Sequence, residues 1–114
     1  MYGADTGGAG VSAVEGEFCI INWENYPSAI PRPSPPFKLL EGEEYAVARK
    51  AANNANTALH KADPSLAGKQ IHEIKPVKFG GSPTDPSNKI ALSLQEHAKL
   101  TTWWNRLLRE LTGK

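Results

Sequence analysis

The sequence predicts an α+β fold. Two stretches, residues 41–64 and 93–114, carry the apolar periodicity of helices. Two short runs rich in β-branched residues, 70–74 and 88–92, lie between them and are separated by a loop rich in Pro, Gly and Ser. At 114 residues the chain has the size of one domain with a modest core. We therefore expect a single domain over 17–114 that ends in a strand, a loop, a strand and a helix.

The N-terminal third is predicted to be mostly extended. Residues 1–16 are rich in Gly and Ala, which indicates a flexible lead-in or a linker from a longer parent chain. The run "EFCIINW" (17–23) is typical of a short strand, and Cys19 within it is expected to be buried and inert. Because Cys19 is the only cysteine, an intrachain disulfide and a cysteine-based zinc site are excluded.

Residues 26–37 contain five prolines and must therefore be extended. We expect a stiff arm packed over the domain. A docking site for a proline-recognising partner is the alternative.

The first helix, over 41–64, begins with acidic residues, which suit the positive end of the helix dipole, and ends at Asp63-Pro64. Its apolar stripe is mostly alanine, so the helix is expected to pack close to a neighbour. His60 near its C-terminus is interpreted as a capping or surface histidine.

The second helix, over 93–114, has a well-defined start, because Ser93 and Glu96 form a capping box. Gly113 is predicted to end it. Its apolar stripe includes Trp103 and Trp104, which are expected to be core anchors rather than base-stacking platforms.

Charge is distributed unevenly along the chain. Residues 1–48 carry seven acids against two bases, and residues 49–114 carry eleven bases against five acids. This pattern suggests either a polyanion-binding second half or two halves that pair with each other. No apolar stretch approaches the length of about 20 residues that a membrane-spanning helix needs, and the N-terminus lacks the pattern of a signal peptide. If the protein is exported, something other than its own N-terminus is expected to carry it.

The polar residues of the C-terminal half converge on one place. His72 and Glu73 leave the first strand of the predicted pair, Asn88 opens the second, and His97 lies in the first turn of the helix, with Thr101 one turn further on. Phosphodiester cleavage by one metal ion needs a base, a cation and a rigid frame, and these residue types supply them. Side chains alternate across a strand, so only one of His72 and Glu73 can face the helix, and the sequence does not say which.

The segment "IHEIKPVKFGGSPTDPSNKIALSLQEHAKLTTWWN" (71–105) resembles the HNH/endonuclease VII superfamily, whose core is a ββα-metal (His-Me) finger. The matching residues are His72-Glu73, Pro76, Gly80-Gly81, Asn88 and His97. The chain is most similar to the nucleases at the C-termini of Rhs-type bacterial polymorphic toxins, in the GH-E or LHH-like groups, over roughly residues 27–112. The resemblance implies a finger over 70–112, with an additional N-terminal helix and an extended Pro-rich arm.

By this resemblance, His72 and His97 would be ligands of one divalent metal ion (Mg, Mn, Zn or Ni), Glu73 would take the general-base position, and Asn88 would orient the loop. The reverse assignment, with Glu73 as ligand and His72 as base, stays open. Some relatives carry a second histidine where this chain has Thr101. Only two strong protein ligands remain, so water and substrate phosphate are expected to complete the shell of a weakly held ion.

The resemblance implies a sequence-nonspecific endonuclease, with DNA as the favoured substrate, acting as the toxic tip of a longer polymorphic toxin. Such a chain would be delivered into a target cell by a specialised secretion system and would be neutralised by a cognate immunity protein. A non-catalytic nucleic-acid- or protein-binding module and an RNase toxin are the alternatives. The bases expected to ring the site and hold phosphates are Lys75, Lys78, Lys89, Lys99 and Arg106, with Lys69 beside them.

Overall fold

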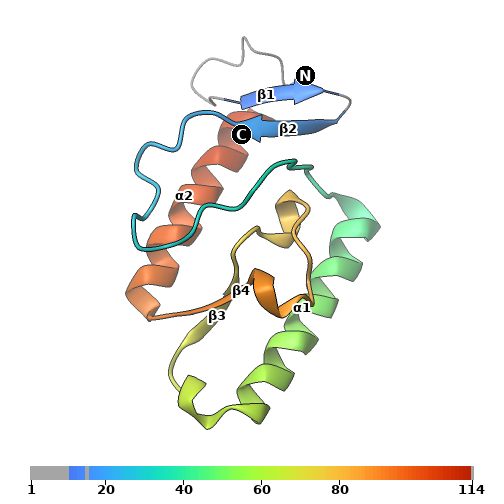
Figure 1. Cartoon of the computed structure of the whole chain (residues 1–114). Helices are drawn as coiled ribbons and strands as arrows, with labels where there is room; N and C mark the ends of the chain where they lie inside the picture. The colour runs from blue at the N-terminus through green and yellow to red at the C-terminus, as the bar shows by residue number, and fades with distance from the viewer. Residues whose placement is uncertain (1–10, 15, 114) are drawn as a thin grey trace.

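The computed structural model describes residues 11–14 and 16–113, and its main elements are two long helices and two separate antiparallel strand pairs (Figure 1). The elements are β1 (Val11–Val14), β2 (Glu17–Ile20), α1 (Gly42–Ala62), β3 (Gln70–Glu73), β4 (Lys89–Leu92) and α2 (Leu94–Thr112). The predicted α+β class is confirmed. Both helices and the strands at 70–74 and 88–92 lie within a residue or two of their predicted bounds.

The strand β1 was not predicted. It lies inside the segment 1–16 that was expected to be a flexible lead-in, and it pairs with β2 from Val11↔Ile20 to Val14↔Glu17. Residues 1–10 and residue 15 of that segment lie outside the described residues.

The strand β2 buries one of its faces. Phe18 and Ile20 point into the core, at 2% and 8% exposure. Cys19, between them, is exposed. The expectation of a buried thiol is therefore wrong, because the alternation of the strand turns Cys19 away from the core.

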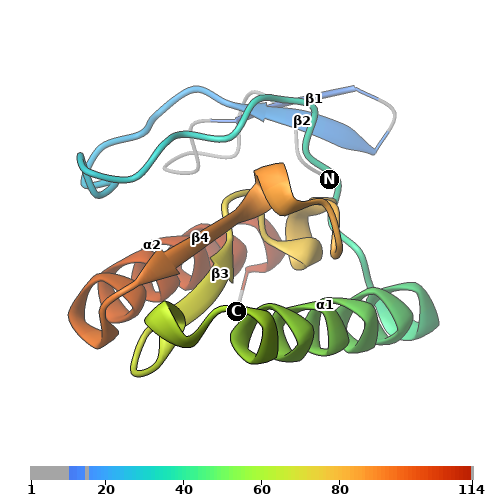
Figure 2. The same cartoon turned by 60° about the horizontal axis from the view of Figure 1, so that its bottom comes forward.

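Residues 21–40 contain no helix or strand of their own and cross the molecule as an extended arm. Phe37 exchanges two backbone hydrogen bonds with Phe18, at 2.8 and 2.9 Å, which ties the arm to β2. Trp23 stacks on Trp103 of α2, with ring centroids 5.2 Å apart and planes inclined by 6°. Figure 2 shows the arm on one side of β3 and β4, with α1 on the other. The prediction of an arm packed over the domain is confirmed.

The core forms where the arm, β2 and α2 meet. The helix α2 buries five residues of the predicted stripe, Leu100, Trp103, Trp104, Leu107 and Leu111, and the sixth, Leu108, is half-buried. Both halves of the Ser93–Glu96 capping box are present, and Gly113 ends the helix with φ +74°. In contrast, Ala52 is the only described residue of α1 that is fully buried, and α1 packs against the short turn at Val77–Phe79. The helix α2 thus supplies most of the helical residues of the core, whereas α1 packs against the loop that joins β3 to β4.

Candidate functional site

Two histidines from different elements lie side by side. His72 is on β3 and His97 is in the first turn of α2, and their ring centroids are 5.2 Å apart. Both side chains line one pocket of about 390 Å³. The capping box fixes the start of α2 and the pairing of β3 with β4 fixes the strand, so the position of each ring follows from a well-determined local structure.

The ring of His72 is held in one orientation. Its Nδ1 lies 2.7 Å from the backbone carbonyl oxygen of Glu73, so Nδ1 carries the proton and donates it to that carbonyl. The other nitrogen, Nε2, then bears a free lone pair. Burial lowers the pKa of His72, opposed by the hydrogen bond to Glu73. His72 is therefore neutral at neutral pH, which is the form that binds a metal ion or accepts a proton.

Glu73 faces the opposite side of β3. Its side chain is buried and accepts from Arg49 Nη2 at 3.1 Å, from Asn56 Nδ2 at 3.1 Å and from Lys89 Nζ at 3.0 Å. Burial alone would raise the pKa of Glu73, but the hydrogen bonds from Asn56 and Lys89 and the two positive charges lower it below its ordinary value. Glu73 is thus ionised, and both carboxylate oxygens are engaged, although the residue also borders the pocket. Between the two neighbours, it is His72 that faces the helix α2 and Glu73 that faces α1.

Asn88 fixes the long loop that follows the pair. Its Oδ1 accepts from the backbone N–H of Lys75 at 2.8 Å, and its Nδ2 donates to the carbonyls of Lys75 at 3.0 Å and Ser82 at 2.9 Å. The chain passes so close to itself here that a Cβ on Gly81 would overlap the carbonyl oxygen of Lys75. The expected tie between Asn88 and the loop backbone is therefore present, and it braces the chain immediately after His72 and Glu73.

The predicted phosphate-binding bases are dispersed. Lys78 lines the pocket of the two histidines, with Nζ 4.6 Å from the ring centre of Tyr45. Lys75 donates to the carbonyl of Pro36 and lies over Phe37. Lys89 is buried against Glu73 and also donates to the carbonyl of Pro83. Lys69 is exposed.

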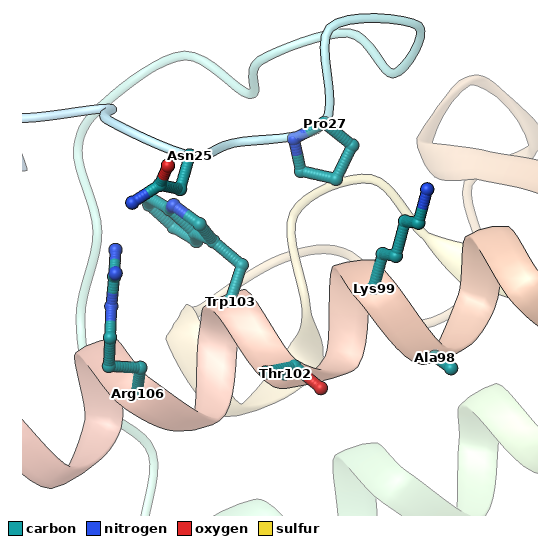
Figure 3. Close-up of a pocket in the computed structure, with 7 residues that line it drawn as sticks. All are labelled: Asn25, Pro27, Ala98, Lys99, Thr102, Trp103 and Arg106. Atoms are coloured by element: carbon teal, nitrogen blue, oxygen red, sulfur yellow. The ribbon is translucent and has the colours of Figure 1, made fainter.

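Lys99 and Arg106 line a different pocket, of about 380 Å³, between the arm and α2 (Figure 3). Of the five bases in the predicted ring, only Lys78 lines the pocket of the two histidines.

Further residues complete the wall of the first pocket. Thr101 and Asn105 follow His97 at successive helical turns and line it, as their spacing indicates. Arg49 lines it from α1, and the sequence alone did not indicate this, because the contact joins residues far apart in the chain. Trp104 also borders the pocket, and its buried Nε1 has no hydrogen-bond partner.

The donor set fits a metal ion in part. Across residues 11–14 and 16–113, no three His, Cys, Asp or Glu side chains converge as a ready-made cation site. Two neighbouring imidazoles are nevertheless ligands that suit Zn, Ni and similar ions. Water and substrate oxygens would have to supply the remaining positions, as the sequence also predicts.

Comparisons with known proteins identify no relative: no family model, no curated protein and no solved structure matches this chain. No helix in the described part of the chain is long and apolar enough to cross a membrane.

Proposed function

We propose that this protein is a metal-dependent endonuclease that hydrolyses phosphodiester bonds in the pocket of His72 and His97. The observation that carries the proposal is the approach of the two rings to 5.2 Å, with Nδ1 of His72 held by a carbonyl so that Nε2 is free. A half-buried, oriented and neutral imidazole beside a second one, in a pocket that Arg49 and Lys78 also line, suits hydrolysis of an anionic ester.

We assign His72 as the general base, which leaves His97 as the one imidazole of the pair that would hold the ion, with water and substrate oxygens in its other positions. The ion, when bound, supplies positive charge that stabilises the phosphate and the leaving oxygen. His72 accepts the proton of the attacking water at Nε2, because Nδ1 is committed to the Glu73 carbonyl. The division of roles differs from the first assignment drawn from the resemblance. It follows from the three donors that occupy the carboxylate of Glu73.

Arg49 and Lys78 are placed to hold the scissile phosphate. Arg49 gives Nη2 to Glu73 and Nε to Asn53, at 3.1 and 3.2 Å, so its guanidinium is oriented while one nitrogen stays available. Lys78 adds a second charge on the same wall. Such contacts position a nucleic acid without reading its sequence, which is consistent with a nonspecific nuclease.

The biological setting that we propose rests on the resemblance to Rhs-type toxin nucleases. The chain would be the toxic C-terminal tip of a longer protein, delivered into a target cell by a specialised secretion system, with DNA as its substrate. A cognate immunity protein in the producing cell would block it.

The direct test is cleavage of a supercoiled plasmid with Mg, Mn, Ni or Zn, with and without EDTA. We expect His72→Ala and His97→Ala to abolish cleavage, whereas His60→Ala should cut like the wild type, because His60 is an exposed histidine on α1. A folded protein that cuts nothing with any of these metals would refute the proposal. A parallel digest of RNA separates a DNase from an RNase.

The two histidines are distinguished by metal binding, measured by calorimetry without substrate. His97→Ala should lose the binding heat, and His72→Ala should retain most of it. Equal loss in both variants would show that both rings hold the ion.

The second candidate is a nucleic-acid-binding module without chemistry. The hydrogen bonds of Glu73 to Arg49, Asn56 and Lys89 favour this alternative. They give the carboxylate that the resemblance placed as general base a structural task instead. Salt-sensitive DNA binding without cleavage would support this alternative.

A further inference from the structure

The pocket between the arm and α2 has the chemistry of a nucleotide site. Trp103 and Pro27 give it mainly apolar walls, and Lys99 and Arg106 rise from α2 on either side of the Trp103 ring, below Asn25 and Pro27 of the arm (Figure 3). Arg106 is held in place, because its Nη2 donates to the carbonyl of Glu24 at 3.3 Å and its Nε lies 3.9 Å from Glu110. The volume, about 380 Å³, nearly equals that of the histidine pocket.

The two pockets open on adjacent stripes of one helix. His97, Thr101 and Asn105 line the histidine pocket, and the next residue after each, Ala98, Thr102 and Arg106, lines the second. Consecutive residues of a helix are about 100° apart, so the two stripes are neighbours on the surface of α2. Neither stripe contains an acidic residue. A chain of phosphates that crosses α2 between the two stripes therefore passes no carboxylate of these six residues, and the carboxylate of Glu110 lies one turn further on, beside Arg106.

We propose that the second pocket is a subsite for the nucleotide that flanks the cleaved phosphodiester. Lys99 and Arg106 hold its phosphate, and the apolar wall of Trp103 and Pro27 packs against its sugar or base. This inference rests on the proposed nuclease function and extends it: the substrate is a polynucleotide that occupies both sides of α2. An acidic peptide also fits the two cations, but the adjacency of this pocket to the histidine pocket on α2 favours a nucleic-acid strand.

Thr102 offers a matched pair of variants, because it is exposed and lines the second pocket. Thr102→Glu places a carboxylate among the proposed phosphate contacts, and Thr102→Gln places a neutral side chain of the same shape there. Binding of a labelled single strand of about 12 nucleotides, within the usual range of site sizes, is measured by anisotropy without metal. We expect Thr102→Glu to weaken binding several-fold and Thr102→Gln to leave it unchanged.

Lys99→Ala tests the phosphate contact itself. For a single strand, each lost contact lowers the salt dependence of log K by about 0.7. We expect a reduction of that size for Lys99→Ala and none for Lys61→Ala, an exposed lysine at the end of α1. In cleavage assays Lys99→Ala should raise KM for the long strand.

The outcomes separate this inference from the proposed function. If the protein cleaves but Thr102→Glu and Lys99→Ala bind and cut like the wild type, the subsite is refuted and the nuclease stands. If nothing is cleaved but Lys99→Ala lowers the salt dependence of strand binding as expected, the nuclease proposal is refuted and the proposal of a strand-binding pocket is supported. Tighter binding of a polyglutamate peptide than of the oligonucleotide at the same salt would overturn the assignment of the pocket to nucleic acid.

Discussion

His72 and Glu73 are adjacent residues with separate tasks. The ring of His72 borders the pocket on the side of α2, and the carboxylate of Glu73 joins Arg49 and Asn56 of α1 to Lys89 of β4. The side chain of Lys89 is only 6% exposed, so its charge depends on Glu73 for compensation. Glu73 therefore stabilises the arrangement of β3, β4 and α1 that presents His72.

Glu73→Gln should lower the free energy of unfolding by about 3 kcal/mol, because it leaves the buried charge of Lys89 unpaired. Urea denaturation measures the change. Adding Lys89→Met should restore part of the loss, since the double variant has no uncompensated buried charge. A single variant as stable as the wild type would show that the ion pair contributes nothing.

The same variant tests the assignment of the base. Where Glu73→Gln remains folded, we expect it to cleave at close to the wild-type rate. A loss of about 100-fold or more in the kcat of folded protein, larger than the loss in Arg49→Ala, would return that role to Glu73.

At the scale of elements, the loop from β3 to β4 needs a close contact between the backbones of Gly81 and Lys75, which leaves no room for a side chain at position 81. Gly81→Ala should prevent folding, with a cost above about 4 kcal/mol, because its Cβ would overlap the carbonyl of Lys75. Gly68→Ala is the matched control. Gly68 has φ +80° but open space around it, so only the cost of the left-handed conformation applies, about 1–2 kcal/mol. Circular dichroism and thermal melts compare the two, and similar melting temperatures would contradict the steric argument.

The elements that the sequence predicted are those whose signals are local. The capping box at Ser93 and Glu96, the stripe of α2 and the alternation in β3 all lie within a few residues. The strand β1 was missed because it has only four residues, Val11–Val14, and follows a stretch rich in Gly and Ala. Its two valines favour a strand, but the partner that pairs with them, β2, is not marked by any local motif.

The site was only partly predictable for the same reason. The meeting of His72 with His97 and the place of Thr101 beside them follow from the order and spacing of these residues. The tie of Asn88 to the loop was expected from the family resemblance. The side that Glu73 faces, the burial of Lys89 and the presence of Arg49 depend on where α1 packs, which no short motif encodes.

At the scale of the whole molecule, the arm and α2 share one core. Trp23 of the arm stacks on Trp103 and meets Trp104 edge-on, with ring centroids 5.2 and 6.3 Å apart. All three tryptophans of the chain therefore lie where the arm meets α2, so tryptophan fluorescence follows the packing of these two segments. We infer that the arm and the histidine pocket unfold together, because α2 belongs to both.

Trp23→Ala should lower stability by about 3 kcal/mol, and Trp23→Phe by clearly less, because phenylalanine keeps an aromatic contact. Tryptophan fluorescence and far-UV circular dichroism should give coincident urea transitions for the wild type. A fluorescence transition that precedes the loss of helix signal would show that the arm detaches on its own.

The opposite orientations of His72 and Glu73 have a consequence for sequence divergence. Substitution at position 73 should be constrained by the residues at 49 and 89, with which its side chain pairs, and not by the histidines. In related chains, loss of the acid at 73 should therefore accompany loss of the base at 89, while positions 72 and 97 change only together or not at all. An alignment of homologues in which 73 varies independently of 89 would show that selection acts on this carboxylate for chemistry rather than for folding.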